Sequence, residues 1–185
     1  MPEGLQTFLS SKSRRYIEMN RQTKVPIEIV YESPESLGLD RVASAAGGWT
    51  RFPGRNILVI SAGTAITVDL VTSEGRFNGG NISPGVSMRL KALHEHTASL
   101  PLVGKDSQFS LLGSSTRQAI LSGVMNGVIF ELEGYVRLLT DQYKDLLVLL
   151  TGGDAALLSP SLHFPHQVEP QLLFEGLQKI LAFNS

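Results

Sequence analysis

Three glycine-rich segments, each directly after a predicted strand, constrain the fold of this chain more than any other feature of its sequence. The apolar residues 56–61 (NILVIS) run into a turn at 61–65, and 146–150 (LLVLL) run into Thr151-Gly152-Gly153. Residues 79–85 crowd glycines and a proline between a strand and a helix. In α/β folds, ligands bind at the carboxyl ends of strands, and anions bind at helix N-termini. Together the three segments predict an α/β fold with a nucleotide or phosphate pocket.

The other elements follow from hydrophobic periodicity and turn residues. Strands are predicted over 26–31, 56–61, 65–71, 76–82 and 146–150, and helices over 4–20, 37–49, 83–94, 155–159 and 170–182. Residues 116–143 also show helical spacing, but the stretch is too long for one unbroken helix. Gly123 and Gly127 within it indicate a break or close packing. This order of strands and helices predicts a layered α/β architecture.

Composition excludes several classes of protein. The 185 residues carry 16 Lys+Arg against 17 Asp+Glu, which gives no electrostatic footprint of nucleic-acid binding. The absence of Cys excludes a disulfide framework and a thiol nucleophile. No stretch approaches the roughly 18 consecutive apolar residues of a membrane span, and the first residues lack the apolar core of a signal peptide. We therefore expect a cytoplasmic protein with neither nucleic acid nor a membrane as a partner.

Residues 38–41 (GLDR) contain the strongest acid–base candidate. Asp40, just inside a predicted helix, can accept a proton from a substrate hydroxyl while Arg41 orients an anionic group. Taken alone, an Asp-Arg dipeptide favours an ordinary surface pair at a helix start. Taken alone, residues 60–65 likewise favour a plain hairpin turn. Residues 100–107 are not a P-loop, because Asp106 follows Lys105.

An ordered series of motifs resembles the type III pantothenate kinase family. In chain order the matching residues are Tyr31-x-x-Pro34, Gly38-x-Asp40-Arg41, Ala62-Gly63-Thr64-Ala65-x-Thr67-x-Asp69, Gly79-Gly80-x-Ile82-x-Pro84-Gly85, Gly113-Ser114-Ser115-Thr116, Thr151-Gly152-Gly153 and Leu173-x-x-x-Gly176-Leu177. They cover residues 26–182 with the family's motif spacing intact. Each motif alone is unspecific, whereas the complete set is highly specific.

The resemblance implies a fold of two ribonuclease-H-like lobes, as in the sugar kinase, heat-shock ATPase and actin superfamily. It divides the chain into residues 1–53, a remnant of the first lobe, and 54–185, a complete second lobe. It also implies ATP-dependent phosphorylation of pantothenate to 4′-phosphopantothenate, the first step of coenzyme A biosynthesis. Family members use Mg²⁺ and a monovalent cation such as K⁺ or NH₄⁺, and they form homodimers that bind pantothenate near the subunit interface.

The same resemblance assigns roles by position. Asp40 is the expected general base. The expected pantothenate contacts are Tyr31, Gly38, Leu39, Asp40, Arg41 and Thr116, and the expected ATP contacts are Gly63, Thr64, Gly152 and Gly153. Ser61 stands where most members carry an Asp that binds the monovalent cation. The Ser61 hydroxyl can still coordinate K⁺ but supplies no charge, so this departure weakens the expectation of a K⁺ requirement.

A second departure concerns the start of the chain. The family begins with a strand and a phosphate loop of the pattern Asp-x-Gly-Asn, which residues 1–30 lack. We therefore expect a truncated first lobe and little kinase activity from these residues alone. The alternative is a non-catalytic ligand-binding or dimerisation module of the Bvg accessory factor type. Ser61 and the missing loop favour that module, whereas the motifs at 38–41 and 79–85 oppose it.

Overall fold

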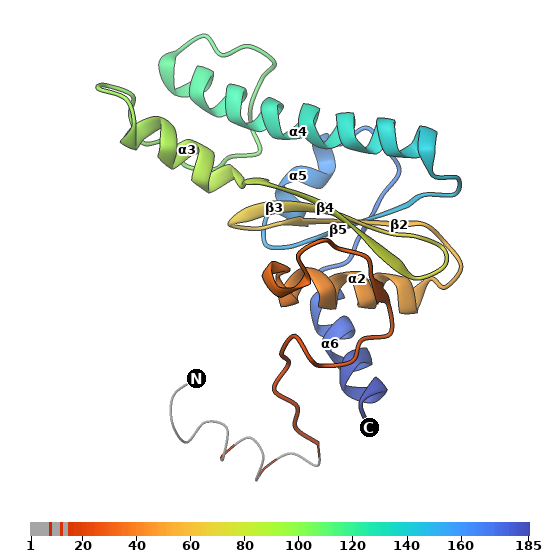
Figure 1. Ribbon diagram of the computed structural model, residues 1–185. Helices are drawn as coiled ribbons and strands as arrows, with labels where there is room; N and C mark the ends of the chain where they lie inside the picture. The colour runs from red at the N-terminus through yellow and green to blue at the C-terminus, as the bar shows by residue number, and fades with distance from the viewer. Residues whose placement is uncertain (1–7, 9–11, 13–14) are drawn as a thin grey trace.

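The computed structural model describes residues 8, 12 and 15–185, which form a mixed sheet with helices on both faces (Figure 1). Within the described residues the sheet has six strands in the order β1-β4-β3-β2-β5-β6. The strands are β1 (Glu28–Ile29), β2 (Ile57–Ala62), β3 (Ala65–Val71), β4 (Arg76–Pro84), β5 (Leu147–Thr151) and β6 (Gln167–Val168). The helices are α2 (Leu39–Arg51), α3 (Val86–Glu95), α4 (Thr116–Gln142), α5 (Ala155–Leu158) and α6 (Leu172–Phe183), with short 3-10 turns η1 (Pro34–Ser36) and η2 (Ser159–Ser161).

The sheet combines a hairpin meander with parallel additions on either side. β3 pairs antiparallel with both β2 and β4, whereas β5 pairs parallel with β2 and β6, and β1 pairs parallel with β4. The central strands β2 and β5 are covered on both faces, which explains their near-continuous apolar sequences. This is the mixed α/β architecture that the sequence predicts.

Two separate cores lie on the two faces of the sheet. Figure 1 shows α3, α4 and α5 on one face and α2 and α6 on the other. Side chains alternate along β2, so Leu58 and Ile60 join the core beneath α4, while Ile57 and Val59 join the core beneath α2. Each face of a strand therefore has its own packing partner.

α2 and α6 pack on each other at glycine positions. A Cβ added at Gly176 would lie 1.8 Å from the carbonyl oxygen of Ala43, and one at Gly47 would lie 2.6 Å from that of Leu172. Only glycine permits this backbone contact between two helices. The contact explains Gly176 in the closing motif of the sequence. It also ties α2 to the C-terminal helix.

The expected break in the long helix is wrong, because α4 is one continuous helix from Thr116 to Gln142. Its buried residues recur every four positions, at Ile120, Val124, Val128, Leu132 and Val136, so a single apolar stripe packs along its whole length. A Cβ at Gly123 or Gly127 would meet nothing within 4 Å. These glycines therefore mark neither a break nor close packing.

By length and hydropathy α4 could span a membrane, but half of the relevant window is buried inside the protein. The core beneath the helix accounts for its apolar face.

The other predicted elements keep their places with shifted ends. β3 has the predicted bounds, whereas the strand predicted over 26–31 shortens to Glu28–Ile29. The helix predicted from residue 83 begins at Val86, because β4 continues to Pro84. By contrast, the helix predicted over 4–20 is wrong for residues 15–20, which are not helical, whereas Phe8 and Lys12 are helical. Its other residues lie outside the described part of the chain. The division at residues 53 and 54 stays a prediction.

Candidate active site

The three glycine-rich segments meet at one end of the sheet. The turn between β2 and β3 contains Gly63 and Thr64, and the backbone N–H of Gly85 donates to the Thr64 carbonyl at 3.0 Å. The N–H of Asp154, after the glycines that follow β5, donates to the Ala62 carbonyl at 2.9 Å. The chain thus joins the three segments by backbone hydrogen bonds and places their side chains around common cavities.

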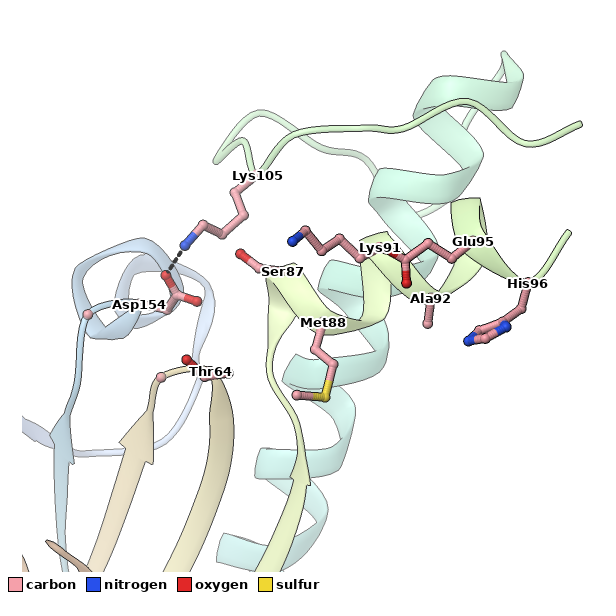
Figure 2. A pocket seen from close by; sticks show the side chains of 11 residues that line it. Thr64, Ser87, Met88, Lys91, Ala92, Glu95, His96, Lys105 and Asp154 are labelled. Carbon is pink, nitrogen blue, oxygen red and sulfur yellow. Dashed lines mark hydrogen bonds and ion pairs between the residues drawn. The ribbon is translucent and has the colours of Figure 1, made fainter.

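One cavity, which we call the α3 cavity, lies between this turn, α3 and the loop that follows α3 (Figure 2). Its volume is about 750 Å³. It is lined by Gly63, Thr64, Ser87, Met88, Lys91, Ala92, Glu95, His96, Lys105, Gly153 and Asp154. Two lysines and the backbone of a glycine turn can bind an anionic ligand here, while Glu95 and Asp154 balance the charge of the lysines.

An ion pair lies across the α3 cavity. Lys105 Nζ donates to Asp154 Oδ1 at 2.5 Å, which joins the loop to the start of α5 (Figure 2). The Lys105 side chain is 39% exposed and that of Asp154 is 9% exposed. Because the Lys105 ammonium is partly exposed, an anionic ligand that enters the cavity can reach it directly.

The second cavity, which we call the α2 cavity, lies between the sheet and the helices α2 and α6, with a volume of about 330 Å³. It is lined by Asp40, Arg41, Ser44, Ser61, Thr67, Asp69, Thr151, Gly152, Gly153, Pro170, Leu173 and Phe174. On this face of the sheet, apolar positions such as Val59 and Leu149 give way to Ser61 and Thr151 toward the strand ends. Gly153 lines both cavities, so they adjoin there.

Asp40 lies in the first turn of α2, where the helix dipole favours a negative charge. Gly38 precedes the helix, and a Cβ added there would lie 2.6 Å from Asp40 Oδ1. A larger residue at position 38 would therefore displace the carboxylate. This explains why the motif combines glycine with aspartate two residues later.

Arg41 is buried and forms an ion pair with Asp69 of β3. Its Nε and Nη2 donate to the same oxygen, Asp69 Oδ1, at 2.9 Å and 2.6 Å. Burial by itself lowers the pKa of Arg41, but the hydrogen bonds and charge of Asp69 outweigh this and raise that pKa above its ordinary value. Burial raises the pKa of Asp69, and the hydrogen bonds and charge of Arg41 offset this only in part. Because arginine does not deprotonate in proteins, the guanidinium stays charged in this site.

The structure brings most of the sequence-predicted site residues to these two cavities. Asp40, Arg41, Ser61, Gly152 and Gly153 line the α2 cavity, whereas Gly63, Thr64 and again Gly153 line the α3 cavity.

Four expected substrate contacts lie outside the two cavities: Tyr31, Gly38, Leu39 and Thr116. The Tyr31 ring lies 5.8 Å from Arg41 Cζ, in a cation–π contact. Leu39 lines a different, largely apolar hollow beside Met19. Thr116 is the exposed first residue of α4. Within one copy of the chain, Thr116 therefore does not share a cavity with Asp40.

Sequence reasoning assigned no role to three charged residues of the site. Asp69 shares a recognised motif with Thr67, but its partner Arg41 is 28 positions away. Nothing in the sequence around Lys105 and Asp154 indicates that these two side chains meet. The alternation of Thr67 and Asp69 with apolar neighbours was the one available signal, because it puts both side chains on the same face of β3.

Comparison with known proteins identifies the family. The family model for type III pantothenate kinase matches residues 5–138. A type III pantothenate kinase from Cytophaga hutchinsonii is 45% identical over 90% of this chain and 71% of its own length. One from Christiangramia forsetii is 41% identical over 94% of this chain and 71% of its own length.

A solved structure with a different description shares the fold. A Campylobacter jejuni protein described as belonging to the Baf family of transcriptional activators superposes with a TM-score of 0.63 at 26% identity, covering 90% of this chain and 72% of that one. The curated relatives, at 36–45% identity, carry the kinase name and favour the kinase over the non-catalytic module. The chain therefore belongs to the type III pantothenate kinase family, whose enzymes use ATP to phosphorylate pantothenate in coenzyme A biosynthesis.

Proposed function

We propose that this chain binds pantothenate in the α2 cavity and the phosphates of ATP in the α3 cavity, with transfer near Gly153. The observation that carries the proposal is the distribution of the motif residues. The pantothenate-side pair Asp40 and Arg41 lines one cavity, the ATP-side pair Gly63 and Thr64 lines the other, and Gly153 lines both. Phosphoryl transfer requires two substrates in adjoining spaces, and the protein contributes positioning and charge neutralisation.

In this proposal Asp40 is the general base. Its carboxylate accepts the proton of the pantothenate hydroxyl as the oxygen bonds to the γ-phosphorus and ADP leaves. Gly38 provides the space for that carboxylate. Arg41 meets the carboxylate of pantothenate, and Tyr31 holds the guanidinium from one side. Gly38 and Leu39, at the N-terminus of α2, contribute backbone groups. The Leu39 side chain does not contribute, because it lines another hollow.

On the nucleotide side, backbone and cations act together. The Gly63 N–H already donates to the Ala65 carbonyl at 3.0 Å. The N–H groups of Thr64, Gly152 and Gly153 are the ones that the two turns offer to phosphate oxygens. Lys91 and Lys105 add positive charge to the same cavity. The arrangement suits a polyphosphate, since cationic side chains and oriented amides both stabilise anionic oxygens.

The two cations of the family differ in how well these residues accommodate them. Among the described residues, no three His, Cys, Asp or Glu side chains cluster as a metal site. Mg²⁺ would therefore enter on the ATP phosphates, with Asp154 and Glu95 as the carboxylates in the same cavity.

At the position for the monovalent cation, Ser61 faces Thr67 on β3 and Thr151 on β5. These hydroxyls supply oxygens, but Asp69, the neighbouring carboxylate, is already bonded to Arg41 and Thr67. The residues present thus offer a weaker site than an Asp would. We propose that K⁺ or NH₄⁺ stimulates this protein less than a member with Asp at this position.

We also propose a cytoplasmic homodimer. Thr116 lies in neither cavity of its own copy, so its contact with pantothenate would come from a second copy. The segment before α4 exposes Leu111 and Leu112, at 71% and 85%, and α4 exposes Phe130. Adjoining exposed apolar side chains of this kind are typical of an interface.

Calorimetry tests the assignment of the cavities. We expect the wild-type chain to bind pantothenate, with tighter binding when ATP is present. Arg41→Lys should weaken pantothenate binding and leave ATP binding unchanged, because Arg41 does not line the α3 cavity. Binding of neither substrate would instead support the non-catalytic module.

The role of Asp40 is tested by the rate of ATP-dependent pantothenate phosphorylation. Asp40→Asn keeps the shape and removes the base, so we expect kcat to fall by about 10²–10⁴-fold. Asp141→Asn, at an exposed position of α4, is the matched control. If the wild-type chain turns over too slowly, the two substitutions are compared at the matching positions of the Cytophaga hutchinsonii relative. Near-wild-type turnover of Asp40→Asn would refute the assignment.

A further inference from the structure

Asp69 is the most enclosed charged group in the part of the chain that the structure describes, with 1% of its surface exposed. It lies on β3, on the face covered by α2 and α6, and it lines the same cavity as Asp40. No role in the reaction has been given to it above. An isolated buried carboxylate is costly, so its retention here calls for a physical reason.

Both oxygens of Asp69 are held by hydrogen bonds. Oδ1 accepts from Nε and Nη2 of Arg41, at 2.9 Å and 2.6 Å. Oδ2 accepts from Thr67 Oγ1 at 2.9 Å. Thr67 and Asp69 are two residues apart on one strand, so the hydroxyl and the carboxylate share a face of the sheet. The strand therefore fixes the carboxylate, and the carboxylate fixes the guanidinium.

Two bonds from Nε and Nη2 to one oxygen set the direction of the guanidinium plane. The Tyr31 and Phe77 rings each lie 5.8 Å from Arg41 Cζ and limit its movement further. A guanidinium carries five N–H donors, and Asp69 uses two. Tyr31 is a further hydrogen-bond partner of Arg41, and the donors on Nη1 and Nη2 that neither residue uses are left for other acceptors. Arg41 lines the α2 cavity, where a substrate carboxylate would meet them.

We propose that Asp69 is a positioning residue that holds the Arg41 guanidinium so that its unused N–H groups face a carboxylate in the α2 cavity, with Thr67 fixing Asp69 in turn. This inference rests on the proposed assignment of Arg41 to the carboxylate of pantothenate. A preformed guanidinium binds a carboxylate without first losing the rotamer freedom of a long side chain. Asp69 acts through Arg41, because both of its oxygens already accept hydrogen bonds from Arg41 and Thr67.

A double-mutant cycle tests the coupling, with the pantothenate Kd as the readout. We expect Asp69→Asn to weaken binding about ten-fold and Arg41→Met by at least as much. In the Arg41→Met background, adding Asp69→Asn should change the Kd less than about two-fold, because the group that Asp69 positions is gone. ATP binding should not change in any variant. Additive losses, or tighter pantothenate binding by Asp69→Asn, would overturn the proposal.

A second measurement needs no ligand and covers the case in which Asp69→Asn fails to fold. The Arg41 Nε–H signal, identified by its loss in Arg41→Lys, is followed by ¹⁵N NMR hydrogen exchange. We expect slow exchange in the wild type and exchange about ten-fold faster in Thr67→Val. The control is Thr140→Val, which removes a hydroxyl bond to Val136 in α4. Equal exchange in Thr67→Val and the wild type would contradict the proposal.

The two measurements separate the possible failures. A wild-type chain that binds no pantothenate would refute the proposed function. The exchange rates would still decide whether Asp69 and Thr67 hold Arg41. Pantothenate binding with an additive cycle would leave the proposed function in place and remove only the role of Asp69.

Discussion

The site contains two ion pairs, Arg41–Asp69 and Lys105–Asp154. In each pair a cation bonds to an aspartate of a glycine-rich motif, but the surroundings of the two pairs differ. The side chains of Arg41 and Asp69 are 6% and 2% exposed, and both belong to regular elements, α2 and β3. Lys105 is 39% exposed and lies in the loop between α3 and α4, while its partner Asp154 is 9% exposed. The first pair is enclosed by the fold, and the second lies across an open cavity.

This difference suits two kinds of ligand. A buried guanidinium with fixed geometry matches a small carboxylate in one orientation. An ammonium on a flexible stem acts as a point charge and can exchange Asp154 for a phosphate oxygen. We infer that the Arg41–Asp69 pair provides geometry and that the Lys105–Asp154 pair provides exchangeable charge. The predictions below test this contrast.

The largest expected effect is on folding stability. Asp69→Asn leaves the buried Arg41 without its counter-charge, and removing one partner of such a pair costs about 3–5 kcal/mol of the free energy of unfolding. Asp154→Asn leaves an ammonium that water can solvate, so we expect a loss of about 1 kcal/mol. Urea denaturation of the two variants at neutral pH measures both values. Equal losses would show that the enclosure of the first pair has no energetic consequence.

The next effect concerns nucleotide binding. Lys105→Ala should weaken ATP binding by about five- to ten-fold at low ionic strength, and the difference should shrink as salt screens the exposed charge. Pantothenate binding should stay unchanged, because Lys105 does not line the α2 cavity. Lys179→Ala, at an exposed position of α6, is the control for a lost positive charge. An equal loss of pantothenate affinity would contradict the separation of the two cavities.

The smallest effect comes from an ion pair on the surface. Arg76 Nε donates to Glu28 Oε2 at 2.9 Å, and the two side chains are 57% and 60% exposed. Glu28→Gln should change the free energy of unfolding by less than about 1 kcal/mol. The same denaturation experiment measures it. A loss as large as that of Asp69→Asn would show that burial does not rank these pairs.

The sequence predicts the elements better than the contacts between them. Strong alternation and turn residues suffice for β3, and its predicted bounds agree with the structure. The continuity of α4 was missed because local glycine propensity was weighed above a stripe of buried residues spaced four apart. That stripe gains its stabilisation from a core that becomes visible only after folding.

In the candidate site, too, the sequence predicts single residues better than the contacts between them. Asp40, Gly63 and Thr64 could be found because short motifs carry them. The Arg41–Asp69 and Lys105–Asp154 pairs join residues 28 and 49 positions apart, so they depend on strand order and on the loop after α3. No local pattern encodes such a pairing. Thr116 shows the opposite case, since a motif identifies it but one copy of the chain does not bring it to Asp40.

The central claim is that two substrates occupy two cavities that adjoin at Gly153, and mapping of backbone amide shifts by NMR tests it most directly. Titration with pantothenate should shift the amides of Arg41, Thr67 and Thr151, whereas ATP with Mg²⁺ should shift those of Thr64, Lys91 and Lys105. Gly153 should respond to both. Pantothenate shifts confined to the α3 cavity, or ATP shifts confined to the α2 cavity, would contradict the account.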